Sequence, residues 1–189
     1  MVDLDGGLSL SSEAPNDAGF LGHCSVKITD NTIMLIGGLT IDEEATNQTY
    51  FYSLSRLEWT LGPPLNQPRA GHSCGVLRGE NGSPETVVVV GGENIDDINY
   101  FVEFLDIRRP SEFVAGPSLL RSQFHAQIVP DPLNRGILLI GGTNGVNNFK
   151  DIQHLPCMEC PWQPHPTSLR VGRSAFVAFP IPDELATCT

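Results

Sequence analysis

The chain has 189 residues, a formal net charge of −11, and 19 glycines and 15 prolines beside an apolar fraction of 40%. This charge argues against binding to the phosphate backbone of nucleic acids, because no lysine and arginine cluster reverses it locally. No apolar run approaches the roughly 18 residues that a membrane span needs, and the first residues lack the basic start and apolar core of a signal peptide. We therefore expect neither nucleic acid nor membrane as a partner, and the turn-rich composition favours many short strands.

Three short apolar runs, each ending in a glycine pair, are the strongest signal along the chain. They are Thr32–Gly38, Thr86–Gly92 and Gly136–Gly142, and they recur about every 50 residues, as in a repeat protein. Branched apolar runs of this length are typical of strands buried on both faces and are too short for helices. Two adjacent glycines permit positive φ or the close approach of another strand.

Other elements recur in the same order around each glycine pair. A Gly-His or related dipeptide precedes it, at 22–23, 71–72, 124–125 and 172–173. Two residues seven positions apart follow it, and in the first copy both are aromatic. They are Tyr52 and Trp59 in the first copy, Asp106 and Phe113 in the second, and Leu155 and Trp162 in the third. Residues Pro68–Ser73 read Pro-Arg-Ala-Gly-His-Ser. Together these elements resemble the kelch repeat, whose signature is a glycine pair, a later tyrosine, a tryptophan about seven residues on and this last motif.

The resemblance implies an all-β fold, a kelch-type β-propeller segment of four-stranded antiparallel blades. We expect an incomplete ring of about three and a half blades, because propellers close with about four to eight. Two explanations stay open: the chain is part of a longer protein, or two chains complete one ring. Apolar faces on the end blades predict self-association. The predicted units are 20–61, 71–115 and 124–164, with 2–10 as a leftover outer strand and 173–180 as the first strand of a further blade.

The loops after the glycine pairs differ between the copies, and loops on a repeated scaffold are where recognition usually occurs. They are therefore the candidate binding sites, with ordinary solvated turns as the alternative. The candidate residues are Asp42, Glu43 and Glu44 in the first loop, Glu93, Asp96 and Asp97 in the second, and Asn144 and Asn147 in the third.

Basic residues also recur, close before the Gly-His position. Arg69 and Arg121, followed by Arg170, are interpreted either as donors to backbone carbonyls or as an inward-facing ring of cations that grips an acidic ligand. The repeated histidines at 23, 72 and 125 are interpreted as structural donors that tie neighbouring strands.

A histidine and cysteine cluster near residue 160 has spacing typical of a zinc site: His154, Cys157, Cys160 and His165. The register implied by the kelch resemblance argues against zinc, because it places the two histidines on the opposite face from the cysteines. In that register Cys157 and Cys160 flank a two-residue turn, with Cα atoms roughly 4.5–6 Å apart. A disulfide and a pair of reduced packing thiols both stay open, and we expect no metal and no cofactor.

The resemblance implies a non-catalytic scaffold that binds another protein through its propeller loops, and no residue has an assigned catalytic role. One alternative is a fragment of an enzyme resembling galactose oxidase, whose copper site needs several tyrosines and histidines. Tyr50, Tyr52 and Tyr100 do not match that site one by one. A secreted glycan-binding propeller is the other alternative, and five cysteines do not decide the compartment.

Overall fold

The computed structural model describes residue 15 and residues 21–79, 84–94, 98–131 and 136–179. These residues form three four-stranded antiparallel sheets and, within the described ranges, no helix. The first sheet contains β1 (Cys24–Lys27), β2 (Thr32–Ile36), β3 (Thr49–Ser53) and β4 (Glu58–Leu61). The second contains β5 (Ser73–Arg78), β6 (Pro84–Val90), β7 (Val102–Asp106) and β8 (Val114–Ala115). The third contains β9 (Gln127–Pro130), β10 (Ile137–Ile140), β11 (Asp151–Leu155) and β12 (Gln163–Ser168).

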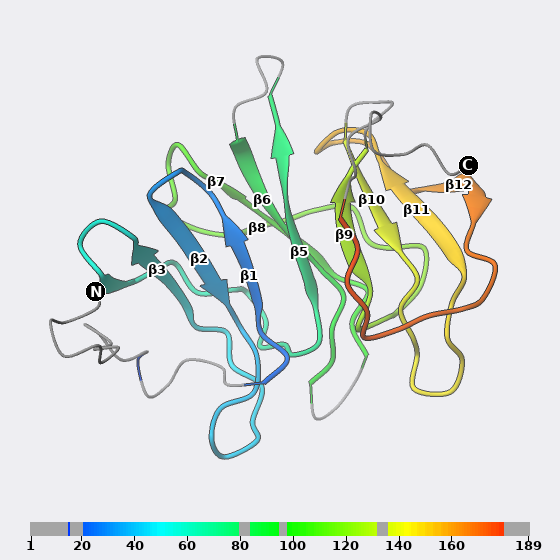
Figure 1. Ribbon diagram of the computed structural model, residues 1–189, viewed down its shortest axis with the longest axis horizontal. Helices are drawn as coiled ribbons and strands as arrows, with labels where there is room; N and C mark the ends of the chain where they lie inside the picture. Colours follow the sequence, from blue (N-terminus) through cyan, green and yellow to red (C-terminus); the bar gives the residue numbers. More distant parts are fainter. Residues whose placement is uncertain (1–14, 16–20, 80–83, 95–97, 132–135, 180–189) are drawn as a thin grey trace, which may run out of the picture.

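Each sheet is a meander in which strands that are neighbours in the chain are paired. The sheets stand side by side like blades, and β5 lies between β1 and β9, the first strands of the other two (Figure 1). This arrangement confirms the predicted all-β fold as a partial β-propeller. No helix in the described part of the chain is long and apolar enough to cross a membrane.

The apolar core lies between the sheets, not inside any one of them. Successive residues of a strand face opposite sides of its sheet, so the valine run of β6 serves two neighbours at once. Val87 and Val89 pack toward the first sheet with Met34 and Ile36. Val88 and Val90 pack instead toward the third sheet, with a group that includes Phe104, Ile137, Leu139 and Trp162. A blade therefore needs a blade on each side to bury both of its faces.

The glycine pairs lie where the segment between two blades crosses the end of a strand. Gly37 and Gly38 have φ values of 54° and 103°, which most other residues rarely adopt. A Cβ atom on Gly37 would lie 2.7 Å from the carbonyl oxygen of Arg69, and one on Gly91 would lie 2.3 Å from that of Gln123. Both predicted reasons for glycine, positive φ and close approach, therefore apply at these positions.

The tyrosine and tryptophan positions of the repeat lie on the outer hairpin of each sheet, and both are aromatic in the first sheet. Tyr52 is directly opposite Trp59, and their ring centroids are 4.7 Å apart. In the second sheet the pairing of Val87 with Leu105 places Leu105, not Asp106, at the tyrosine position. The prediction of Asp106 was wrong because this hairpin is longer, which a fixed spacing of seven residues misses.

The predicted ends of the chain differ from what the structure describes. Residues 2–10 lie outside the described residues. Residues 173–179, the described part of the predicted last strand, form no strand. They are nevertheless tied to the third sheet, where Gly142 N donates to Arg173 O at 2.7 Å and Ala175 N donates to His125 O at 3.0 Å. The last strand of the third sheet also continues to Ser168, beyond the predicted limit of 164.

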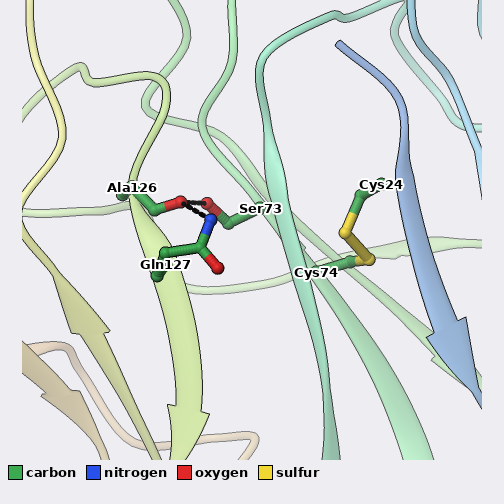
Figure 2. Close-up of a disulfide and its surroundings, with 5 residues drawn as sticks. All are labelled: Cys24, Ser73, Cys74, Ala126 and Gln127. Atoms are coloured by element: carbon green, nitrogen blue, oxygen red, sulfur yellow. Dashed lines mark hydrogen bonds between the residues drawn. A yellow bond between two sulfur atoms is a disulfide. The ribbon is translucent and has the colours of Figure 1, made fainter. Parts of the chain in front are cut away.

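A disulfide that the sequence did not reveal joins the first two sheets (Figure 2). Cys24 of β1 and Cys74 of β5 are bonded, with Cα atoms 5.9 Å apart. On the other side of β5, Ser73 Oγ donates to Ala126 O at 2.7 Å, so two successive residues, Ser73 and Cys74, tie β5 to the two neighbouring sheets. The disulfide gave no sequence signal, because Cys24 and Cys74 occupy different positions in their repeats, opposite Ile36 and Val89 respectively.

We predict that replacing both Cys24 and Cys74 with alanine lowers the free energy of unfolding by about 4 kcal/mol, the chain-entropy value for a loop of this length. The bonded residues are 50 apart in the sequence. The control is the same double replacement at Cys157 and Cys160, whose short loop gives about 2 kcal/mol in the same treatment. Urea unfolding of both variants measures the difference, and equal losses would contradict the role assigned to the inter-sheet bond.

Candidate functional site

The loop after the first glycine pair is a compact turn that holds two glutamates outward. Thr40 N donates to Glu44 O at 2.8 Å, and Glu43 N donates to Thr40 O at 3.0 Å. This closed turn holds Glu43 at a φ of 61°, a conformation uncommon for a residue with a side chain. Ile41 at the tip of the turn is 77% exposed. The loop lies at the lower edge of the sheets, the same end as the loop 143–150 (Figure 1).

An acidic cavity of about 540 Å³ opens between this loop and the second sheet. Glu43, Glu44 and Glu93 contribute three carboxylates to it, and none of the described residues that line it is basic. Apart from Asn94, the other residues of the wall are apolar. The lining is Leu39, Glu43, Glu44 and Ala45 from the first loop, Pro68 from the segment between the sheets, and Glu93 and Asn94 from the second loop.

The structure thus brings together three of the predicted loop residues, Glu43, Glu44 and Glu93. Asp42 is exposed on the same turn but does not line the cavity. Asp96 and Asp97 lie outside the described residues. In the third loop, Asn144 Oδ1 accepts hydrogen bonds from the backbone N of Val146 and Asn147 at 3.2 and 2.8 Å. The side chain of Asn144 therefore shapes its own turn, as asparagine commonly does in loops.

Arg69, expected as a possible ligand contact, is instead a buried structural residue. Its side chain is 0% exposed, and Nη2 donates to Glu103 Oε1 at 2.6 Å. Nη1 donates to the carbonyl oxygens of Gly91 and Phe101 at 2.9 and 3.0 Å. Burial lowers the pKa of Arg69, and the neighbouring Glu103 carboxylate opposes that shift. Arg69 thus ties the segment between the first two sheets to β7.

The corresponding junction between the second and third sheets has two side-chain amides, Gln123 and Gln153, where the first junction has the charged pair of Arg69 and Glu103. Gln123 Nε2 donates to Gly141 O at 3.3 Å, as Arg69 does to Gly91 O, and Gln153 Nε2 donates to Gln123 Oε1 at 2.9 Å. The backbone agrees, since Gly38 N donates to Arg69 O and Gly92 N donates to Gln123 O. Gln123, not Arg121, is therefore the counterpart of Arg69. The sequence alignment paired the two arginines, but their distances from the Gly-His position differ between the copies.

Arg121 has a separate role beside the third sheet. Its Nη2 is bonded to Asp151 Oδ2, and its guanidinium lies 3.8 Å from the centre of the Phe149 ring. Stacking on an aromatic ring and pairing with a carboxylate both hold an arginine in place. The inward ring of cations that the arginine spacing suggested is therefore absent at these two residues.

The three recurring histidines are not equivalent, which corrects the alignment of the third copy. His125 shares its position with Gly71 and Gly22: Gly71 N donates to Gly22 O, and His125 N donates to Gly71 O. It has a φ of 53°, so a histidine occupies a left-handed position where the earlier copies have glycine. His72 is buried, and burial, with the charge of Arg69 as a further cause, lowers its pKa to about 3.

The residues of the apparent zinc motif do not converge. Cys157 and Cys160 are bonded to each other, with Cα atoms 5.1 Å apart, within the distance expected for the hairpin. His154 Nε2 lies 3.3 Å from Asp131 Oδ2, and its ring centroid is 6.5 Å from that of His165. Within the described ranges no group of three or more histidine, cysteine and acidic residues is arranged to hold a metal.

We predict that Glu103→Gln alone lowers the free energy of unfolding by about 3–5 kcal/mol, because it leaves the buried charge of Arg69 uncompensated. Adding Arg69→Gln should restore part of that loss, because the Gln123–Gln153 pair shows that two amides satisfy the same junction. Urea unfolding of the singles and the double measures the coupling, and additive losses would contradict it. The control is neutralisation of the exposed pair of Lys27 and Asp30, which should change the free energy of unfolding far less, because water and salt screen exposed ion pairs.

No protein-family model matches the chain, and no curated protein matches it in sequence. Among solved structures, 165 chains match. One, described as the structure of YjhT, has a TM-score of 0.62 and 16% sequence identity, with 81% of this chain and 54% of that chain covered. The chain therefore spans about half the length of this neighbour. At this identity the likeness shows the fold alone.

Proposed function

We propose that this chain is a kelch-type, non-catalytic scaffold that binds another protein through the loops at the lower edge of its blades. The observation that carries the proposal is the acidic cavity between the first two loops, lined by Glu43, Glu44 and Glu93. It lies on the loops that vary between repeats, while the residues shared between repeats are used in packing. The kelch assignment rests on the glycine pairs, the Tyr52–Trp59 pair and the Pro-Arg-Ala-Gly-His-Ser motif.

The chemistry of the cavity favours a basic segment of the partner. Three carboxylates accept charge-assisted hydrogen bonds from lysine or arginine, and the overall charge of −11 attracts a cation from a distance. Leu39 in the wall and the exposed Ile41 beside it offer apolar contact to the stem of a long side chain. A lysine or arginine next to an apolar residue matches this combination.

We predict that Glu44→Gln and Glu93→Gln each weaken binding of a fluorescent peptide with the sequence Arg-Leu-Arg by about fivefold to tenfold, the effect of one charge-assisted hydrogen bond. Fluorescence anisotropy at low and moderate salt measures the affinity. The control is Glu58→Gln, an exposed acid on β4 that does not line the cavity. Equal weakening in all three variants would mean that the peptide responds only to overall charge and would contradict a specific site.

We also propose that two copies associate through the segment that follows β12. Val171, Val177 and Phe179 are 64%, 81% and 72% exposed there, an unusual density of apolar surface. Arg173 holds the backbone place that Arg69 and Gln123 hold at the two junctions, yet it is exposed. A second copy would cover these apolar side chains.

We predict that sedimentation shows dimers or larger species whose proportion rises with protein concentration and with salt, since salt screens the charge of −11. Replacing Val177 and Phe179 with serine should weaken association by about tenfold or more, because it removes the apolar area that drives it. Ile41→Ser is the control, since Ile41 is equally exposed but lies on another loop. A single monomer peak at all concentrations would contradict the proposal.

A further inference from the structure

The disulfide between Cys157 and Cys160 lies at the tip of the outer hairpin of the third sheet, away from the acidic cavity. Cys160 N donates to Cys157 O at 3.2 Å, which closes the turn between β11 and β12. Cys157 is exposed and Cys160 is half-buried. The tip is also held to the second sheet, because Thr86 Oγ1 donates to Met158 Sδ at 3.2 Å.

The fold does not depend on this bond. The corresponding hairpin of the first sheet has Leu54 and Leu57 in the places of the two cysteines, and it closes through a hydrogen bond from Leu57 N to Ser53 O at 2.7 Å. In the third sheet, the pairing of His154 with Gln163 holds the strands of the hairpin next to the bond, and the contact of Met158 with Thr86 holds its tip. Opening the bond therefore leaves the surrounding contacts in place.

The other disulfide of the described chain has opposite properties. Cys24–Cys74 joins two sheets, spans 50 residues, and lies beside the apolar cluster between those sheets, where Cys74 packs. Cys157–Cys160 spans three residues within one hairpin. Restraining a long loop stabilises a fold more than restraining a short one. Folding therefore protects Cys24–Cys74 far more than it protects Cys157–Cys160.

We propose that Cys157–Cys160 is a thiol–disulfide exchange site that accepts a small thiol at Cys157, independently of the proposed binding function. The thiolate sulfur attacks Sγ of the exposed residue Cys157 and forms a new S–S bond with it, while the bond to Cys160 breaks. The bonding electron pair leaves on Cys160 Sγ, which takes a proton from water. A second small thiolate then attacks the mixed disulfide, which releases a small-molecule disulfide and leaves both cysteines reduced.

The half-buried Cys160 is the resolving cysteine in the reverse direction. Its thiolate attacks Cys157 Sγ in the mixed disulfide, displaces the small thiol and restores the original bond. The turn keeps the two Cα atoms 5.1 Å apart, so this return step is intramolecular. The exposed residue Cys157 thus receives the thiol, and the half-buried residue Cys160 displaces it.

The test uses the full chain in glutathione buffers of increasing reducing strength, followed by alkylation and mass spectrometry of peptides. We expect Cys157–Cys160 to open at a ratio of [GSH]² to [GSSG] at least about tenfold lower than Cys24–Cys74, a difference of about 30 mV in a two-electron couple. Circular dichroism should be unchanged at that point. Opening of both bonds together, or loss of the β-sheet signal with the first, would overturn the proposal.

A matched pair of variants tests the roles of the two sulfurs. Cys160→Ala leaves Cys157 exposed and should form a mixed disulfide with oxidised glutathione, while Cys157→Ala leaves the shielded Cys160 and should react about tenfold more slowly, since access limits exchange. The intact Cys24–Cys74 bond reports that both variants fold. Equal rates, or faster reaction at Cys160, would contradict the assignment of Cys157 as the attacked sulfur.

Discussion

The junction between neighbouring sheets is the constraint on which this structure depends. Each blade is apolar on both faces, so no blade satisfies its own core. At each junction the connecting segment places one long polar side chain, Arg69 or Gln123, inside the next blade. That side chain hydrogen-bonds to the backbone carbonyl of the glycine pair and to the third strand of the next blade. The hydrogen bonds of this side chain thus set the alignment of neighbouring blades, and that alignment allows their apolar faces to be buried.

The acidic cavity inherits its shape from the first of these junctions. Its walls come from two blades and from Pro68, which directly precedes Arg69. Arg69 joins the segment after the first blade to β7 of the second, and the Cys24–Cys74 bond joins β1 to β5. The carboxylates of Glu44 and Glu93 are therefore carried by a rigid frame, which reduces the ordering that a ligand must impose on the site.

The repeated elements made the fold predictable from the sequence. The contacts between different copies of the repeat could not be predicted in the same way. Glycine pairs, branched runs and the Tyr52–Trp59 spacing report local requirements, and the facing positions of Cys157 and Cys160 follow from the turn alone. The Cys24–Cys74 bond and the Arg69–Glu103 pair join residues of different repeats, so no local spacing marks them. His125 was misaligned by one residue because it occupies a position where the other copies have glycine. The cavity was partly predictable, since loop variation pointed to its glutamates, but only the packing of two blades shows which of them meet.

The two junctions also constrain how such a chain changes over generations. One buries a guanidinium against a carboxylate, and the other buries two neutral amides in the same arrangement. A route from one to the other by single substitutions passes through a state with one buried, uncompensated charge. Such intermediates are disfavoured, so the two positions are expected to change almost together, and each junction keeps its own inherited solution. Blades that share a backbone plan thereby become specific to their neighbours, and exchanging one blade for another breaks the match at both of its sides.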